Sequence, residues 1–285
     1  MIANFLNVVN LFNPNFVSFL ICIFTEDLIL TLLLNFCPNP ERGPMWGPTG
    51  HRVIAEVANN YLTNNSIEKI NKILNGETLV NASTYADDIK SDSRFDNFYD
   101  WHFINMELDD NYEDIEPSQK GDVFFAINKC IDILESDSAS DSDKSFYLKL
   151  LVHFVGDLHQ PLHIGRYEDR GANRVYVKWF GRNSNLHSVW DSDMINGYNM
   201  SYTELAVNLP NPDFSVFTKE AEDFKRDDIL DWVNEIHSYT NQIYSEVSVD
   251  DKLGYEYQYK NFDTVRELLL IGGIRLAKIL NYLFD

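Results

Sequence analysis

The strongest constraint on the fold is residues 145–158, a stretch that is apolar on nearly every side yet carries a histidine and an aspartate. A helix that is apolar all round belongs in the centre of a protein, and Pro161 ends this one. His153 and Asp157 are four residues apart, so they lie about 40° apart on one helix face. A buried carboxylate without a cation carries a large desolvation cost, which a bound metal removes. The sequence therefore predicts a metal site on a central helix.

A second segment repeats this spacing. His187-Ser-Val-Trp-Asp191 again places an imidazole and a carboxylate four residues apart, and His163 follows Pro161, where the chain can fold back toward the same site. One such pair is more often a surface hydrogen bond. Two pairs, one of them on an apolar helix, favour the converging nitrogen and oxygen ligands that zinc prefers.

Three further segments are candidates to complete the site: Trp46-Gly-Pro-Thr-Gly-His51, Tyr85-Ala-Asp87-Asp88 and Trp101-His102-Phe-Ile-Asn105. Each also has a structural interpretation. His51 can close a first helix, Asp87 or Asp88 can lie on a solvated helix face, and Trp101 can belong to the core.

The rest of the chain predicts one mainly α-helical domain over residues 46–285, with short connections and a small β-hairpin. The hairpin is expected at 174–180, where residues alternate between apolar and polar. Ser66 is expected to cap a helix, and Ser201-x-x-Glu204 has the pattern of a capping box. Helical spacing covers residues 50–62, 67–74, 82–89, 121–134, 145–158, 185–195, 227–247 and 263–284.

Residues 1–45 differ from the remainder. They contain two apolar stretches but no basic start, and neither stretch reaches the roughly 20 residues of a membrane span. We interpret this segment as a signal or anchor, with a non-native extension as the alternative. The expected location is outside the cell or in a vacuole or lysosome, with membrane anchoring through this segment as a further option. Sequons at Asn64, Asn81 and Asn199 fit a secreted glycoprotein.

Charge and cysteine content limit the function and the chemistry. A net charge of −21 excludes a generic nucleic-acid binder, because a phosphate backbone is repelled at long range. Any phosphate chemistry therefore needs local cations. Cys130 is the single cysteine of residues 46–285, so this domain forms no internal disulfide, and we expect Cys130 to be a core thiol.

Taken in chain order, these motifs resemble a known family. They are Trp46-Gly-x2-Gly-His51, Ala86-Asp87, His102-Phe-Ile, His153-x3-Asp157-Leu-His-Gln-Pro-Leu-His163, Gly171-Ala-Asn173, Asn185-Leu-His-Ser-Val-Trp-Asp191 and Gly272-Gly-Ile-Arg-Leu-Ala-Lys. The set is similar to the zinc-dependent, single-strand-specific nucleases: the fungal S1/P1 enzymes and the plant bifunctional nucleases. The resemblance implies a helical domain of the phospholipase C/P1 nuclease type with three zinc ions in one cleft.

The resemblance also implies a ligand set. Asp87, His102, His153 and Asp157 match the ligands of one zinc; Trp46, His51 and Asp157 match those of a second; His163, His187 and Asp191 match those of the third. Trp46 would bind through a free α-amino group and its carbonyl oxygen, which requires removal of residues 1–45. Asp157 would bridge two ions, and three zinc ions would offset the acidic charge locally.

The implied activity is endonucleolytic hydrolysis of single-stranded DNA and RNA to 5′-phosphate products, with 3′-nucleotides as further substrates. Bound zinc lowers the pKa of water to about 7 and so supplies hydroxide. Asp87 and Lys90 are the expected catalytic residues, and Lys90 stands where the fungal pattern has a phosphate-contacting arginine. Phe103 is expected to stack an unpaired base, Asn105 replaces a fungal aspartate, and Asn173 is expected to contact the substrate.

Several alternatives stay open at this point. Lys90 can be a solvated surface residue, Phe103 a core residue and Asn173 a turn residue. Gly171-Ala172-Asn173 departs from the family's Gly-Gly-Asn. His159 is expected beside the ligands or in the core. A zinc-dependent phospholipase C and an inactive zinc-binding relative remain alternative functions. We expect a monomer without a stable protein partner.

Overall fold

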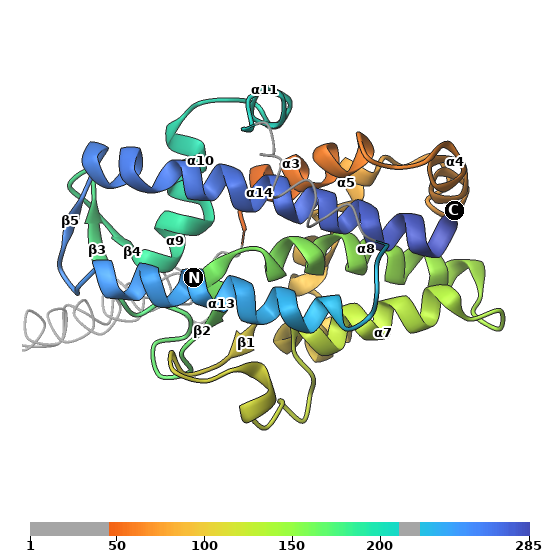
Figure 1. The fold of residues 1–285 in the computed structure, drawn as a ribbon, viewed down its shortest axis with the longest axis horizontal. Helices are drawn as coiled ribbons and strands as arrows, with labels where there is room; N and C mark the ends of the chain where they lie inside the picture. The colour runs from red at the N-terminus through yellow and green to blue at the C-terminus, as the bar shows by residue number, and fades with distance from the viewer. Residues whose placement is uncertain (1–45, 211–222) are drawn as a thin grey trace, which may run out of the picture. The chain divides into compact units, whose positions relative to one another are not determined.

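The predicted central helix is α8, Asp141–Leu158 (Figure 1). It begins at Ser140, whose hydroxyl accepts a hydrogen bond from the backbone N–H of Asp143 and so caps the helix. Every residue from 150 to 158 is buried. The apolar stretch therefore lies in the core, as predicted, and it takes His153 and Asp157 with it.

The computed structural model describes residues 46–210 and 223–285, which are mainly helical. The mainly α-helical fold class predicted from the sequence is confirmed. The longer helices besides α8 are α3 (Pro48–Asn59), α4 (Asn64–Ile73), α7 (Val123–Glu135), α13 (Asp228–Glu246) and α14 (Tyr255–Phe284). Helix α7 packs along α8, and α14 packs along α3 and also contacts α8.

Short elements connect these helices. They are α5 (Leu79–Ala82), α6 (Tyr85–Asp88), η1 (Ile89–Ser91), η2 (Ser93–His102), η3 (Tyr112–Asp114), η4 (Pro161–His163) and α11 (Tyr202–Val207). Most of the segments η1 to η4 are single turns. The short helix α6 and the segments η2 and η4 carry Asp87, His102 and His163 respectively to the region of α8.

Two small sheets complete the described fold. Strand β1 (Ile104–Asn105) pairs in parallel with β2 (Ile164–Gly165). The predicted hairpin is present as β3 (Tyr176–Trp179) antiparallel to β4 (Arg182–Asn185). Its two-residue turn has φ of 47° at Phe180 and 79° at Gly181, as a type I′ turn requires. Strand β5 (Lys252–Leu253) adds a parallel partner to β3 that the sequence did not predict.

Some local predictions need correction. Thr63, not Ser66, caps α4, because the Thr63 hydroxyl accepts from the Ser66 backbone N–H. The helix expected at 185–195 is divided into α9 (Leu186–Ser188), a π-helical segment η5 (Val189–Asp193) and α10 (Met194–Gly197). Helix α14 starts at Tyr255, eight residues before the predicted start. The capping box at Ser201 and Glu204 is confirmed.

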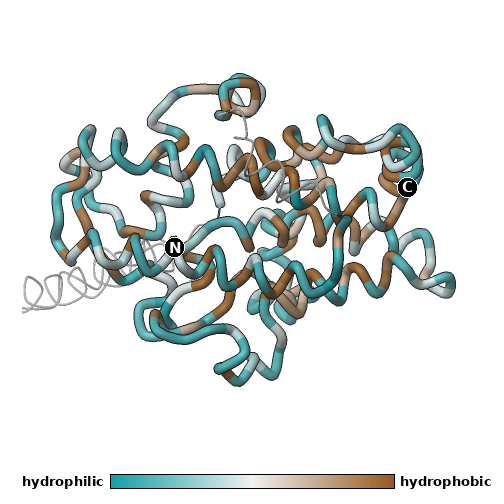
Figure 2. Tube along the Cα trace, in the orientation of Figure 1, coloured by the Kyte–Doolittle hydropathy of each residue, from teal (hydrophilic) through white to brown (hydrophobic). Residues whose placement is uncertain are grey.

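Apolar and hydrophilic residues are interspersed along α7 and α14 (Figure 2). Helix α7 buries one face, whereas in α14 every residue from 268 to 277 is buried. The described residues belong to one compact unit, Pro44–Asp285. Cys130 is a buried free thiol in α7, as expected. Among the residues that the structure describes, none of the helices combines the length and the apolar character of a membrane span. The signal or anchor prediction for residues 1–45 lies outside the described residues.

Candidate metal centre

Eight predicted histidine and aspartate ligands come together around the end of α8. They lie on separate elements: His51 on α3, Asp87 on α6, His102 on η2, His153 and Asp157 on α8, His163 on η4, His187 on α9 and Asp191 on η5. All are buried except Asp87, which is partly exposed. Three groups of their ligand atoms are close enough to share an ion.

The Asp157 carboxylate is the centre of this arrangement. One oxygen, Oδ2, lies 2.7 Å from His102 Nδ1 and 3.1 Å from His153 Nε2. The other oxygen, Oδ1, lies 3.4 Å from His51 Nε2. The two oxygens therefore face two different sets of ligands, which is the arrangement of a bridging carboxylate.

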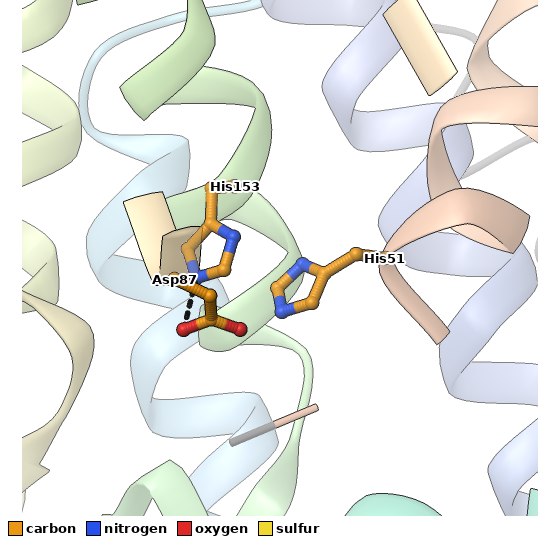
Figure 3. A group of neighbouring side chains, drawn as sticks. All are labelled: His51, Asp87 and His153. Carbon is orange, nitrogen blue, oxygen red and sulfur yellow. Dashed lines mark ion pairs between the residues drawn. The ribbon is translucent and has the colours of Figure 1, made fainter. Parts of the chain in front are cut away.

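His51, Asp87 and His153 reach one another from three different segments (Figure 3). The rings of His51 and His153 stack at a centroid distance of 3.9 Å. Asp87 Oδ1 lies 3.5 Å from His153 Nε2. Gly156 permits this packing, because a Cβ there would lie 2.5 Å from His51 Nδ1.

His163, His187 and Asp191 form a separate group. Their ligand atoms lie within 4.8 Å of one another. The two imidazole rings are nearly parallel at 15° with centroids 5.2 Å apart, and His163 Nε2 is 3.6 Å from Asp191 Oδ1. The π-helical segment η5 carries Asp191, and π-helical turns are frequent at functional sites.

Backbone carbonyl groups orient three of the histidines. The Nδ1 atoms of His153, His163 and His187 lie 2.8, 2.9 and 2.7 Å from the carbonyl oxygens of Ser83, His102 and Gly171 respectively. Because a carbonyl accepts, each Nδ1 carries the proton and each Nε2 faces the cluster. This pattern is usual for metal-bound histidine.

Burial favours the neutral, ligand form of the other two histidines. It lowers the pKa of His51 to about 4 and the pKa of His102 to about 3. A histidine must lose its second proton to bind a metal. These two side chains are therefore already in the binding form near neutral pH.

The three carboxylates differ in their electrostatics. Burial alone would raise the pKa of Asp87, but the charges of His153 and Lys90 outweigh it and lower the value to about 2. For Asp157 the neighbouring histidines likewise outweigh burial and hold the pKa well below its usual range. Burial dominates at Asp191 and raises its pKa to about 7.

The residues fit a metal cluster by two criteria. First, His51 Nδ1 and Nε2, Asp157 Oδ1, His163 Nε2 and Asp191 Oδ2 are buried without a hydrogen bond to any described residue. Such atoms cost about 1–3 kcal/mol each unless something binds them. Second, tetrahedral ligands around zinc lie about 3.3 Å apart. The closest pairs of ligand atoms here are 2.7–3.6 Å apart, which brackets that spacing, and the atoms of each group lie within 4.8 Å of one another.

Trp46 and Lys90 also lie at this site. Trp46 is fully buried, and the next residue, Gly47, donates its N–H to the Asp191 carbonyl oxygen at 2.9 Å. Ligation through the Trp46 backbone stays a prediction. The Lys90 ammonium contacts the Asp87 carboxylate, and 18% of its side chain is exposed. Lys90 is therefore not a freely solvated surface residue.

The three predicted substrate contacts are more peripheral. Phe103 is partly buried and makes an edge contact with Tyr99 at 5.9 Å. Asn105 is exposed on β1 beside Gly165. The Asn173 amide donates to the Arg170 carbonyl oxygen at 2.9 Å, which supports the turn interpretation.

Two histidines lie outside the ligand groups. His159 is buried, its Nδ1 donates to the Val155 carbonyl oxygen at 2.7 Å, and its Nε2 faces Arg275. His237 contacts the backbone carbonyl groups of Glu107 and Ile164, which is a structural role. The sequence analysis missed the backbone carbonyl groups that orient the ligand histidines. Every residue carries a carbonyl group, and no sequence pattern marks the ones that accept from a histidine.

Comparisons with known proteins agree with this site. A profile of the S1/P1 Nuclease family matches residues 46–285. Endonuclease 4 of Arabidopsis thaliana is 29% identical, over 92% of this chain and 95% of the relative. Nuclease S1 of Aspergillus oryzae is 27% identical over 81% and 89%, and Nuclease P1 of Penicillium citrinum is 30% identical over 56% and 63%. The chain therefore belongs to the S1/P1 nuclease family, a metal-dependent family, and is a hydrolase that acts on the ester bonds of nucleic acids.

Proposed function

We propose that this nuclease is a zinc-dependent endonuclease that cleaves single-stranded DNA and RNA to 5′-phosphate products and also removes 3′-phosphates from nucleotides. One observation carries the proposal: the two oxygens of buried Asp157 face two different histidine sets, 2.7 Å from His102 and 3.4 Å from His51. A carboxylate in that position without cations would be strongly destabilising.

The ligand sets of three ions are those that the family resemblance implies. Asp87, His102, His153 and Asp157 would hold one zinc, His51 and Asp157 with the Trp46 backbone a second, and His163, His187 and Asp191 a third. The atoms of the third set lie together as one group, whereas the structure groups His51 with Asp87 and His153, and His102 with His153 and Asp157. Zinc, when bound, supplies positive charge for phosphate oxygens and lowers the pKa of water. The protein contributes fixed ligand positions, since Nδ1 of His153, His163 and His187 is already committed to a backbone carbonyl.

Lys90 is the proposed phosphate contact. Its ammonium group is held by Asp87 at the edge of the cluster, where a scissile phosphate can approach. A lysine acts there as a point charge and not as a bidentate fork. Phe103, next to the ligand His102, would stack an unpaired base, which favours single strands. Asn105 is exposed beside it and is available for base contacts, and Asn173 would contact the substrate from its turn.

The proposal is tested by incubating the chain with zinc and with single-stranded or double-stranded DNA, with and without EDTA. The same assay is run with protein that begins at Trp46, because a free α-amine there would complete one ligand set. We expect zinc-dependent cleavage of single strands, 5′-phosphate ends by mass spectrometry and release of phosphate from 3′-AMP. Phosphatidylcholine vesicles are the control substrate.

The outcomes separate the alternatives. Cleavage that survives complete zinc removal would contradict the metal role. Headgroup release from the vesicles without DNA cleavage would favour a phospholipase C. Bound zinc with neither activity would indicate an inactive relative.

A further inference from the structure

A buried carboxylate outside the ligand set joins the loop after β2 to helix α13. Asp169 is 7% exposed and accepts hydrogen bonds through both oxygens. Its Oδ1 accepts from the Ala172 N–H at 2.8 Å and from the Tyr244 hydroxyl at 2.6 Å. Its Oδ2 accepts from Arg166, whose guanidinium also lies 4.5 Å from the centre of the Tyr244 ring. Arg166 and Ala172 hold Asp169 within the loop, and the Tyr244 hydroxyl joins it to α13.

The loop held in this way is strained. Arg170, Gly171 and Ala172 have φ of 58°, 59° and 64°, a left-handed turn that costs residues other than glycine about 1–2 kcal/mol each. A Cβ at Gly171 would overlap the Leu162 carbonyl oxygen. Such strain persists only where surrounding contacts hold it, and it concentrates at functional sites. The hydrogen bonds of Asp169 to Arg166 and Ala172 are the contacts that hold this turn from within the loop.

The turn presents two backbone carbonyl groups to His187. The Gly171 oxygen lies 2.7 Å from His187 Nδ1, and the Ala172 oxygen accepts from the His187 backbone N–H at 3.4 Å. The first bond determines which ring nitrogen carries the proton. It therefore directs Nε2 toward His163 and Asp191, with which His187 forms a ligand group.

We propose that Asp169 and Tyr244 are positioning residues for the His163–His187–Asp191 metal site. They hold the left-handed turn whose Gly171 carbonyl sets the tautomer and ring orientation of His187. This inference rests on the proposed zinc site, although neither residue contacts a metal ligand. Loss of a partner that hydrogen-bonds a metal ligand directly changes metal affinity by about 10-fold to 100-fold, and loss of a residue that holds such a partner should change it by no more than this.

The test uses the full chain and counts zinc per chain by native mass spectrometry at buffered free zinc. Asp169→Ala is expected to weaken one zinc by up to about 100-fold and to leave the other two unchanged. Asp169→Asn should restore most of the affinity, because its Oδ1 can still accept from Ala172 and Tyr244. Tyr244→Phe removes one hydrogen bond with little change in volume and should show a smaller loss at the same site.

A second measurement separates positioning from a general loss of stability. Nitrogen-15 NMR of the zinc-free protein reports the tautomer of His187, which should be Nδ1–H in the wild type and mixed in Asp169→Ala. Tyr239→Phe is the matched control, since Tyr239 is a partly buried tyrosine on the same helix. It should leave zinc affinity and tautomer unchanged.

The outcomes are distinguishable. Unchanged zinc affinity and an unchanged His187 tautomer in both Asp169→Ala and Tyr244→Phe would overturn the positioning role while leaving the zinc site intact. His187→Ala is the reference for the site itself. If that variant binds as much zinc as the wild type, the proposed third site fails, and the positioning inference fails with it.

Discussion

The buried carboxylate of Asp191 provides a test of the metal site. Replacing it with asparagine should stabilise the zinc-free protein at pH 8 and destabilise the zinc-bound protein. Asp191 is fully buried, and burial raises its pKa from 3.8 to about 7. A carboxyl group whose folded pKa is raised stabilises the protein fully below its unfolded pKa, and this contribution is lost as the pH rises through the folded pKa. Zinc-free wild-type protein should therefore lose stability between about pH 4 and pH 7.

The magnitude follows from the shift. About three pKa units at 1.36 kcal/mol each give a loss of about 4 kcal/mol at pH 8. At pH 5 the same relation gives about 2 kcal/mol. Asp191→Asn has no titrating group there, and its Oδ1 can still accept from the Gln160 amide, which lies 3.2 Å from Asp191 Oδ1. We expect the free energy of unfolding of the variant, relative to the wild type, to rise by about 2 to 3 kcal/mol between pH 5 and pH 8.

Zinc should reverse the order of stability of the wild type and Asp191→Asn at pH 8. At free zinc of about 10,000 times its dissociation constant, each site stabilises the wild type by about 5.5 kcal/mol, which exceeds the loss of about 4 kcal/mol at pH 8. The variant lacks one of the three side-chain ligands of its group and gains less. With saturating zinc at pH 8, Asp191→Asn should be the less stable protein.

The assay is urea denaturation followed by far-UV circular dichroism, at pH 5 and pH 8, in EDTA and in zinc. Asp193→Asn is the matched control: Asp193 lies on the same π-helical segment, is partly exposed and accepts from the Ser184 hydroxyl at 2.9 Å. It should show no such pH-dependent gain. A stability difference for Asp191→Asn that stays the same at both pH values in EDTA, or that zinc fails to reverse, would refute the reasoning.

Three further predictions concern residues around the cluster. Lys90→Ala should lower kcat by about 100-fold with zinc content unchanged. Lys90→Arg should retain most activity. Loss of zinc in Lys90→Ala would instead indicate a structural role through Asp87. Gly156→Ala should displace His51, since the new Cβ would lie 2.5 Å from its ring. Counting zinc per chain should then show weaker binding at one site. Full zinc occupancy in this variant would contradict the close packing. Ala172→Gly should relieve the left-handed strain at φ 64°. Glycine also gains entropy in the unfolded chain, so the net stabilisation should be at most about 1 kcal/mol. A lower melting temperature in the variant would count against this prediction.

The helices were predictable because their signals are local. The apolar stretch before Pro161 marked α8, and the capping box at Ser201 marked α11, both as observed. The helix boundaries and the N-cap of α4 were less accurate, because Thr63 and Ser66 are both good caps and only the path of the chain selects one. The break of residues 185–195 into α- and π-helical parts was also missed, since no residue type marks a π-helical turn.

The sequence alone indicated the side chains that the structure brings together. Four-residue spacing on buried helices marked His153–Asp157 and His187–Asp191, and the resemblance to a known family added His51, Asp87 and His102. Tertiary structure alone decided which atoms meet: that the two Asp157 oxygens face different histidines, and that carbonyl groups of Ser83, His102 and Gly171 select the Nε2 atoms. These contacts join residues far apart in the chain through backbone groups that every residue carries, so no local pattern encodes them. The role of Asp169 likewise depends on a contact with Tyr244, 75 residues away in the chain. Their hydrogen bond is partly shielded from water and holds the turn beside His187 in place.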